Sequence, residues 1–450
     1  MTAVLPDRDV TVPASEVPAA EVSAHEVPAV LSRSILADGF DFVLDTEQSR
    51  GSYLVDARTG DRYLDMFTFF ASSALGMNHP ALTTPESRAE LGAIAVNKPS
   101  NSDIYTVTMA RFVDTFTRVL GDPALPHLFF IDGGALAVEN ALKVAFDWKS
   151  RRNESRGLAA PGSRVLHLRG AFHGRSGYTM SLTNTDPNKV ARFPKFDWPR
   201  IDAPYLRPGA DPVALEAESL RQARAAFEAY PDDIACFIAE PIQGEGGDRH
   251  IRPEFFAAMR ALCDEFDALL IFDEVQTGCG MTGTAWAYQQ LGVRPDVVAF
   301  GKKTQVCGLM AGGRVDDVPD NVFAVSSRIN STWGGNLTDM VRSRRILEVI
   351  EADDLMRNAR VLGDHLLDRL RDLASEFPAL VRDPRGRGLM CAFSMPSTAA
   401  RDALVSRLWD RHVIMLPSGV DSVRFRPALT VSRDELDAAV DAVRAVLNTL

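Results

Sequence analysis

Two adjacent lysines in the stretch GKKT, residues 301–304, occupy the position best suited to covalent chemistry. They follow VVAF, residues 297–300, which has the length and composition of a buried strand. A lysine placed there can bind a phosphate, form a covalent bond with a carbonyl compound, or lie on the surface. A phosphate-binding P-loop is excluded, because its first glycine is replaced by Asp296 and a second lysine precedes the threonine.

An acidic residue ends an earlier apolar run. In ALLIFDEVQTG, Asp273 follows a strand-like segment, and Lys302 comes one helix and one strand later. The carboxyl ends of parallel strands meet at one edge of a sheet, where ligands bind, so we expect Asp273 and Lys302 to lie close together. Asp273 could simply cap a helix. A buried carboxylate is nevertheless unfavourable unless it meets a cation, such as a protonated pyridine nitrogen.

A phosphate site is suggested by HLFFIDGGALAVENALK, in which a strand ends at Gly133-Gly134 and a helix begins. Glycines let backbone N–H groups approach an anion, and a helix N-terminus carries roughly half a positive charge. A Gly-Gly turn alone is weak evidence. With a pyridine-directed Asp273 and a Schiff-base Lys302, however, the cradle predicts pyridoxal 5′-phosphate (PLP) as cofactor.

The elements that position these residues alternate along the chain. Apolar runs predict strands at 127–131, 164–168, 235–240, 268–274 and 297–300. Helical spacing of apolar residues marks segments between them, such as 137–150 and 252–266. This alternation predicts an α/β fold with a mostly parallel sheet covered by helices.

Four parts are predicted: a mobile leader at 1–28, an N-terminal segment at 29–85, a large domain at 86–336 and a small α+β domain at 337–450. The N-terminal segment carries a hairpin around residue 59 that could join the small domain. The small domain begins with a pattern that reads as one long amphipathic helix. Strand candidates and a final helix follow it.

Composition narrows the function. The 450 residues carry a net charge of −11, which argues against a nucleic-acid partner. The leader lacks the pattern of a signal peptide, and no apolar run approaches the ~18 residues of a membrane span, so no membrane association and a cytoplasmic location are expected. The five cysteines form no CxxC pair and are expected to be buried and reduced. No histidine has metal-ligand spacing, so no metal site is predicted.

The motifs GGALAVENALK, FHGRSGY, AEPIQGEGG, LLIFDEVQTGCG, PDVVAFGKKT and STWGGN make the chain, from about residue 30 to 450, resemble the class III aminotransferases of fold type I. The resemblance implies a large domain with helices on both faces of its sheet and a smaller α+β domain. One departure is Met281, where the family motif GxGRTG has Arg.

The resemblance also assigns roles. Lys302, rather than Lys303, would be the Schiff-base lysine and general base, and Asp273 the partner of the ring nitrogen. The remaining cofactor contacts would be Gly134 and Ala135 at the phosphate, Thr332 from a second subunit, Phe172 stacked on the ring, Gln276 at the phenolic oxygen and Glu240 in support. Lys303 would be structural or solvent-facing, and His173 would either support the ring or pack under its loop.

The segments FTFFASSALGMN, NKPSNSD and GKKTQVCG are most similar to family members that act on the terminal amine of lysine. A homodimer with shared active sites would then transfer the ε-amino group of L-lysine to 2-oxoglutarate by a ping-pong mechanism. The products would be 2-aminoadipate 6-semialdehyde and L-glutamate. Another ω-amino acid, ornithine or γ-aminobutyrate, is the alternative substrate. A dinucleotide-binding oxidoreductase is disfavoured because no GxGxxG follows the first strand, and an inactive paralogue is disfavoured by the intact site.

The resemblance implies two carboxylate sites. Arg175 would bind the distal carboxylate that both substrates carry, and Arg424 the carboxylate next to the reacting carbon, which only glutamate and 2-oxoglutarate possess. With lysine bound, Arg424 would be an unpaired buried charge. Glu245, in a glycine-flanked loop, would neutralise it and swing away for the dicarboxylate. Asn330 of the partner subunit would contact the head of lysine.

Overall fold

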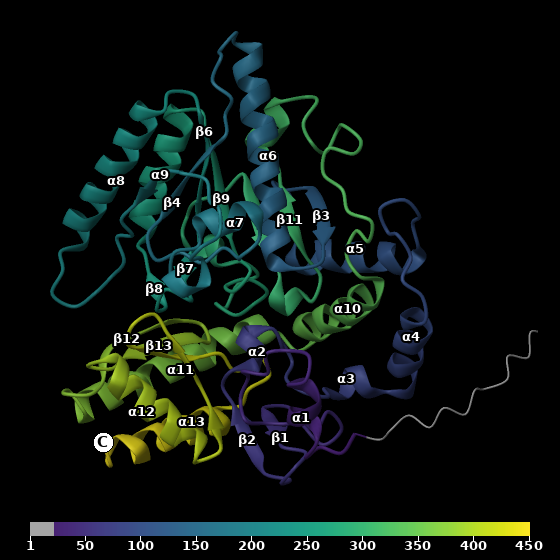
Figure 1. Ribbon diagram of the computed structural model, residues 1–450, viewed down its shortest axis with the longest axis vertical. Helices are drawn as coiled ribbons and strands as arrows, with labels where there is room; N and C mark the ends of the chain where they lie inside the picture. The colour runs from purple at the N-terminus through teal and green to yellow at the C-terminus, as the bar shows by residue number, and fades with distance from the viewer. Residues whose placement is uncertain (1–21) are drawn as a thin grey trace, which may run out of the picture.

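The sheet predicted from the alternating pattern is present in the computed structural model, which describes residues 22–450 (Figure 1). Seven strands are ordered β3-β11-β10-β9-β6-β4-β5. Their bounds are β3 His127–Ile131, β11 Cys307–Ala311, β10 Val297–Phe300, β9 Leu269–Asp273, β6 Ile234–Ala239, β4 Arg164–Leu168 and β5 Arg200–Ile201. The five predicted strands are confirmed. The sequence reading missed β5, which has two residues, and β11, which contains a glycine and runs antiparallel to both neighbours.

Helices cover both faces of this sheet, as the strand composition predicts. Leu270 and Phe272 of β9 share a core cluster with Phe256 of α9 (Pro253–Glu265). Their neighbours in sequence, including Ile271, point to the other face and pack in a cluster with Trp148 of α6 (Gly134–Ser155). Because alternate residues of a strand face opposite sides, an apolar run such as LLIF needs a covering layer on each side.

Further helices come before the C-terminal elements in the chain, and the first of them, α1 and α2, lie beside the N-terminal hairpin (Figure 1). They are α1 Val27–Leu31, α2 Thr68–Ala71, α3 Pro80–Thr83, α4 Pro85–Ala95, α5 Val107–Leu120, α7 Gly177–Leu182 and α8 Pro212–Ala229. A short ribbon, β7 Ile242–Gln243 with β8 Arg249–His250, lies between the large sheet and the C-terminal elements (Figure 1). The predicted leader lies outside the described residues except for its last part, in which α1 begins.

The C-terminal elements form two smaller sheets, one of which includes the N-terminal hairpin, whose purple ribbon lies beside the yellow C-terminal elements in Figure 1. One sheet has the order β1-β2-β14 and the other β12-β13-β16-β15. The bounds are β1 Tyr53–Val55, β2 Arg62–Asp65, β12 Arg382–Arg387, β13 Met390–Ser394, β14 Val413–Ile414, β15 Leu416–Ser418, β16 Ser422–Phe425, α12 Thr398–Trp409 and α13 Arg433–Leu447. Pairing of β2 with β14 supports our proposal that 29–85 belongs with the small domain.

The prediction of one long helix after residue 336 is wrong, because the structure has two helices there, α10 (Leu337–Ala352) and α11 (Leu355–Glu376). The break falls at Asp353-Asp354, where Asp354 has the left-handed φ of 48°. Aspartate is a poor residue for a helix interior and tolerates this conformation. α10 packs on α5 and α4, and α11 packs on β12. The proposed domain boundary near residue 336 therefore lies just before α10, a helix that contacts the large domain and also packs on α11 of the small domain.

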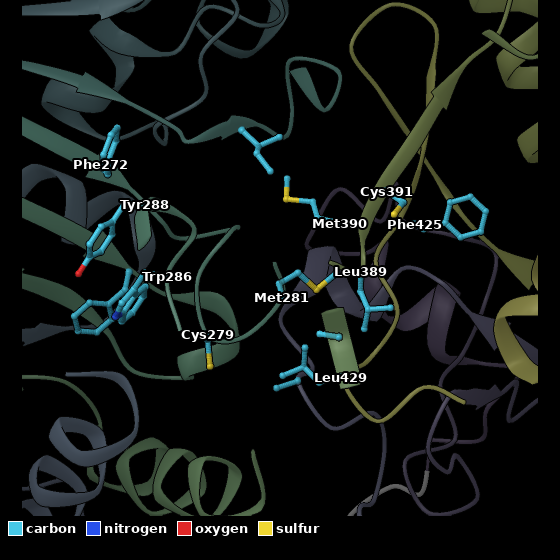
Figure 2. Packing of buried hydrophobic residues seen from close by; sticks show 14 of the residues in the cluster. Phe272, Cys279, Met281, Trp286, Tyr288, Leu389, Met390, Cys391, Phe425 and Leu429 are labelled. Atoms are coloured by element: carbon cyan, nitrogen blue, oxygen red, sulfur yellow. The ribbon is translucent and has the colours of Figure 1, made fainter. Parts of the chain in front are cut away.

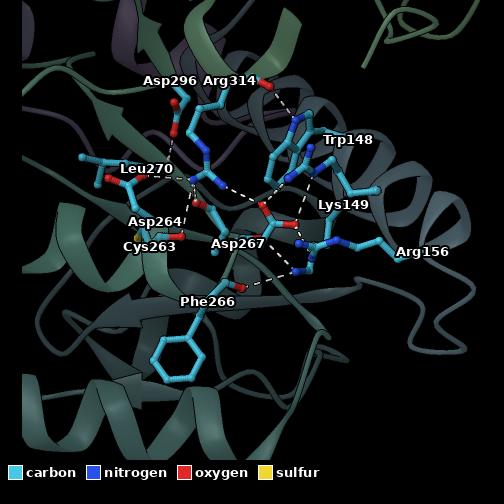
Figure 3. Close-up of polar contacts among 12 residues, drawn as sticks. Trp148, Lys149, Arg156, Cys263, Asp264, Phe266, Asp267, Leu270, Asp296 and Arg314 are labelled. Atoms are coloured by element: carbon cyan, nitrogen blue, oxygen red, sulfur yellow. Dashed lines mark hydrogen bonds and ion pairs between the residues drawn. The ribbon is translucent and has the colours of Figure 1, made fainter. Parts of the chain in front are cut away.

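The C-terminal end of α6 is fixed by a charged cluster centred on Asp267, shown in Figure 3. This carboxylate accepts from Arg152 of α6 and from Arg156, which directly follows α6, each at 2.9 Å, and from Arg314 at 2.8 Å. Lys149 of α6 donates to the carbonyl of Asp267 at 2.8 Å. The cluster ties α6 to the turn that leads into β9, so the two elements that carry the predicted phosphate cradle and Asp273 are joined at their far ends.

An apolar contact joins the segment after β9 to the C-terminal elements. Met281 is buried, and Figure 2 shows its side chain near Leu389 and Leu429. The carbonyl of Met281 accepts from the backbone N–H of Leu389 at 3.0 Å. These apolar surroundings suit the thioether of Met281. All five cysteines are buried and free, as expected from their apolar surroundings.

Candidate active site

A cavity of about 640 Å³ lies at the carboxyl ends of β9 and β10 and at the N-terminus of α6. It brings together many of the predicted residues: Gly134, Ala135, Phe172, Arg175, Glu240, Asp273, Gln276 and Lys302. It is also lined by residues that the sequence reading missed, among them Ser72, Thr277, Gln305 and Asp339. The parallel pairing of β9 and β10 explains why Asp273 and Lys302 meet here.

Asp273 is buried and held in place from two sides. Its Oδ1 accepts from the backbone N–H of Val275 at 3.1 Å, and its Oδ2 lies 2.8 Å from Nδ1 of His173. Burial would lower the pKa of His173, but the carboxylates of Asp273 and Glu240 outweigh burial and raise that pKa above its ordinary value. His173 therefore contacts the carboxylate of Asp273, which supports the first of its two predicted roles. The helix-cap alternative for Asp273 is not what the structure shows.

Lys302 begins a short 3-10 helix (Lys302–Thr304) directly after β10, and its side chain faces the cavity. Among residues 22–450 its amine has no hydrogen-bond or ion-pair partner. Burial, followed by the charges of Arg424 and Arg426, lowers the pKa of Lys302 to about 8. A larger share of the amine is therefore neutral and nucleophilic near pH 8 than in an ordinary lysine.

The neighbouring Lys303 points the other way. It is buried, so the predicted solvent-facing alternative is wrong and the structural one is favoured. Its Nζ donates to the carbonyl of Gln276 at 2.8 Å, and burial lowers its pKa to about 7. The lysine pair thus divides into one amine in the cavity and one amine that ties the turn after β10 to the turn after β9.

The predicted phosphate cradle has the required backbone. Gly133 adopts the left-handed φ of 101°, which favours glycine, and α6 starts at Gly134 with its free N–H groups toward the cavity. A Cβ on Gly174 would come within 2.5 Å of the side chain of Ala135, so the loop after β4 closes tightly over the helix start. A helix of this length with an open N-terminus is suited to bind an anion.

Glu240 and Gln276 are each oriented by neighbours. Glu240 is buried and accepts from the backbone N–H groups of Phe172 at 3.0 Å and Gly244 at 3.1 Å; burial raises its pKa to about 7. The amide oxygen of Gln276 accepts from Arg426 at 2.9 and 3.1 Å. Sequence patterns alone did not single out Arg426. It follows Arg424 by two residues in SVRFRP, a spacing at which two side chains face the same side of a strand.

Glu245 lies between two cations. Its Oε2 accepts from Nη2 of Arg424 at 3.1 Å, and its Oε1 accepts from Nζ of Lys189. Arg424 is only 3% exposed, and its Nε has no partner among the described residues. Burial opposes ionisation of Glu245, but Arg424 and Lys189 outweigh it and lower the pKa of Glu245 below its ordinary value. The predicted Glu245–Arg424 pair is thus present, and Lys189 is a partner that the sequence reading missed.

The structure does not bring Asn330 and Thr332 into this cavity. Both are exposed, and the cavity lining of the same chain contains neither. Their loop is fastened to an earlier segment by hydrogen bonds, for example from Nδ2 of Asn101 to the carbonyl of Gly335 at 3.0 Å. Arg175 is exposed at the rim of the cavity, and no carboxylate pairs with it within the described part of the chain.

Comparison with known proteins agrees with this geometry. The model of the aminotransferase class-III family matches residues 36–447. The chain belongs to the class III aminotransferases. It is 74% identical over 423 residues to the L-lysine-epsilon aminotransferase of Mycobacterium tuberculosis (strain ATCC 25618 / H37Rv), covering 93% of this chain and 94% of that protein. It is 59% identical over 427 residues to that of Amycolatopsis lactamdurans, covering 93% and 94%.

The fold is similar to the solved structure of lysine aminotransferase from M. tuberculosis in the internal aldimine form. The TM-score is 0.94 at 72% identity, covering 95% of this chain and all of that one. The predicted fold type I architecture is therefore confirmed. Between residues 22 and 450, none of the helices has the length and apolar character that crossing a membrane requires.

PLP is the cofactor that the family and this solved structure indicate, and the cavity fits it. A helix N-terminus with two glycines is free to hold the phosphate. Asp273 offers a fixed carboxylate for the ring nitrogen, and Lys302 offers an amine that no side chain or carbonyl of residues 22–450 binds. Within the described residues, no group of His, Cys, Asp and Glu side chains is arranged to hold a metal ion.

Proposed function

We propose that this protein transfers the ε-amino group of L-lysine to 2-oxoglutarate, giving 2-aminoadipate 6-semialdehyde and L-glutamate. The observation that carries this proposal is the Glu245–Arg424 pair, which does not itself line the cavity but lies close enough for both charges to act on Lys302. A site that accepts both an amine without a neighbouring carboxylate and a dicarboxylate needs a cation whose charge can be covered and uncovered. Glu245 covers Arg424 in the state described here.

When bound, PLP supplies an aldehyde that takes up an amino group and a ring that accepts an electron pair. Asp273 would hold the proton on the ring nitrogen, and His173 keeps the carboxylate of Asp273 oriented. The neutral Lys302 amine would act as the base that moves the proton from the substrate carbon. Gly134 and Ala135 would donate N–H groups to the phosphate, Phe172 would stack on the ring, and Gln276 would donate to the phenolic oxygen.

Substrate orientation would be set by two arginines. Arg175, at the open rim, would bind the carboxylate far from the reacting carbon. Arg424 would bind only the carboxylate next to that carbon, after Glu245 has left it. The pair Glu245 and Arg424 would therefore admit two substrates of different charge at one place.

Isotope transfer tests the proposed function directly. Holoenzyme given L-lysine labelled with ¹⁵N at the ε position, together with 2-oxoglutarate, should produce ¹⁵N-glutamate, whereas lysine labelled at the α position should produce unlabelled glutamate. Rates with ornithine and γ-aminobutyrate, measured in parallel, test the alternative substrates. Glutamate labelled from the α position, or a faster reaction with ornithine, would overturn the proposal.

The switch itself can be tested with Glu245→Ala. Lysine binding would then enclose Arg424 without a counter-charge, and the lysine half-reaction should slow about 100-fold, as expected for a loss of about 3 kcal/mol. A dicarboxylate supplies its own counter-charge, so the glutamate half-reaction should change far less. Both half-reactions are followed by the absorbance of the cofactor in single turnovers. Equal losses in the two would contradict the switch.

The lowered pKa of Lys302 gives a pH-dependent prediction. Only the neutral amine attacks the aldehyde of PLP, and a lower pKa makes it neutral at lower pH. Incorporation of PLP into the cofactor-free protein should therefore rise with pH and be half-maximal near pH 8. In Arg424→Met one of the charges that lowers the pKa is absent, and the midpoint should move upward. Stopped-flow absorbance between pH 6 and 10 measures it; a wild-type midpoint above pH 10 would contradict the assignment.

We further propose a cytoplasmic homodimer in which Thr332 and Asn330 complete the cavity of the partner subunit. Their exposure away from their own cavity supports this arrangement. The loop that carries them is hydrogen-bonded to a segment with exposed apolar side chains, where Ile104 is 66% and Tyr105 81% exposed. Such a patch is suited to be covered by a second copy. Acceptance of the amino group by 2-oxoglutarate is likewise part of the proposal.

A further inference from the structure

Lys189 is the second cation that contacts Glu245, and nothing in the proposed mechanism uses it. It ends a short 3-10 helix (Pro187–Lys189) in a largely exposed loop, yet its side chain is only 28% exposed, because its amine reaches Glu245 and lies 5.6 Å from the ring centroid of Phe172. A lysine in an exposed loop usually extends into solvent, so the contact of this amine with the Glu245 carboxylate indicates a role at the site.

The two oxygens of Glu245 are divided between the two cations. Oε1 is bound by Lys189 and Oε2 by Arg424, and the two cations differ in burial, since the Arg424 side chain is 3% exposed. The Glu245 backbone lies beside Gly244 and Gly246, and its carbonyl accepts from Gly419 at 3.0 Å. A rotation of the side chain can therefore release Oε2 from Arg424 while Oε1 keeps its contact with Lys189.

We propose that Lys189 is a positioning residue that keeps Glu245 paired after it has left Arg424, and that it thereby favours the dicarboxylate half-reaction. This inference rests on the proposed function of Glu245. When the carboxylate next to the reacting carbon binds Arg424, the displaced Glu245 would otherwise be an uncompensated anion close to another anion. Lys189 compensates it. With L-lysine in the cavity, Glu245 stays on Arg424, and Lys189 adds little.

The expected pattern is the reverse of that for Glu245→Ala. In Lys189→Met, the second-order rate constant of the 2-oxoglutarate half-reaction should fall about tenfold, which lies between the small effects of exposed charge pairs and the larger effects of fully buried ones. The L-lysine half-reaction should change less than about threefold, which is the range for exposed charges. Lys189→Arg keeps a cation at this place and should restore most of the loss.

A matched control comes from the same loop. Within the part of the chain that the structure describes, the amine of Lys195 donates only to the backbone carbonyls of Val190 at 2.7 Å and Phe193 at 3.0 Å, so Lys195→Met removes a positive charge from the loop without touching Glu245. It should leave the ratio of the two half-reactions unchanged. If Lys195→Met reproduces the effect of Lys189→Met, the loop acts as a general attractor of anions and the proposal is wrong.

Binding of an unreactive ligand gives a readout that is independent of turnover. Glutarate, a dicarboxylate that cannot react, should bind the Lys189→Met holoenzyme about tenfold more weakly than wild type, whereas pentanoate, its monocarboxylate counterpart, should not. Calorimetric titration measures both. In the Glu245→Ala background, Lys189→Met should have no effect on glutarate, because the anion that Lys189 compensates is absent.

The outcomes separate this inference from the proposed function. If wild-type holoenzyme does not react with L-lysine, the proposed function fails, while the glutarate titrations still test the contact. If wild type reacts with L-lysine but Lys189→Met slows both half-reactions equally, or weakens glutarate binding in the Glu245→Ala background as well, the role of Lys189 is overturned.

Discussion

Lys302→Ala is expected to slow the half-reaction with L-lysine by about a thousandfold or more, within the range for loss of a general base and covalent nucleophile. The cavity keeps the proposed phosphate cradle and Asp273 in this variant, so PLP should still bind, but borohydride should no longer fix it to the protein. Single-turnover absorbance measures the rate, and peptide mass spectrometry of borohydride-treated protein locates the label. In wild type the labelled peptide should carry the modification on Lys302.

Lys303→Met is the matched control, because the two lysines are adjacent and only one faces the cavity. Loss of the Lys303 amine leaves the Gln276 carbonyl without a donor, which should lower the free energy of unfolding by about 1–3 kcal/mol. Labelling at Lys302 should persist. A label on Lys303 in wild type, or near-normal turnover in Lys302→Ala, would contradict the assignment of the pair.

Asp273→Asn is expected to reduce both half-reactions by about a thousandfold, since replacing one member of a buried charged pair typically removes 3–5 kcal/mol. The neutral amide preserves shape but cannot hold a proton on the ring nitrogen, and it also weakens the contact with His173. The loss should affect L-lysine and glutamate alike, because both reactions need the ring to accept an electron pair. Rates from single turnovers with each substrate test this equality.

His173→Gln separates the carboxylate from its support. Asp273 keeps its charge and its contact with the Val275 N–H in this variant, so activity should fall only about tenfold, the value of one hydrogen bond to a charged group. An equal loss in Asp273→Asn and His173→Gln would mean that orientation, rather than charge, is what Asp273 contributes.

Local patterns were sufficient for five of the seven strands of the large sheet and for the centre of the site. Apolar runs of four to six residues with helical segments between them predict parallel strands whose carboxyl ends lie at one edge of the sheet. Asp273 is the last residue of one such strand, and Lys302 comes two residues after the end of another. Gly133 and Gly134 predict the cradle for the same reason: a strand end and a helix start are both readable in the sequence. The named cofactor roles came from the family resemblance.

Contacts between distant segments could not be predicted in this way. Lys189 lies in a loop without periodicity, and its contact with Glu245 depends on how that loop folds back over Phe172. The antiparallel β11 has the same apolar character as a parallel strand, so its direction is set by the short connection after Lys302 rather than by its composition. The break before α11 depends on two aspartates that a helical pattern tolerates elsewhere.

The contact between Arg426 and Gln276 fixes the polarity of an amide. A guanidinium only donates, so the oxygen of the Gln276 side chain must face Arg426, and the NH₂ end is left for the cavity. At this position the lining of the cavity therefore offers hydrogen-bond donors and no acceptor, which favours a deprotonated oxygen on the bound molecule. A glutamate at position 276 would also accept from Arg426, but its second oxygen would repel a deprotonated oxygen in the cavity instead of donating to it.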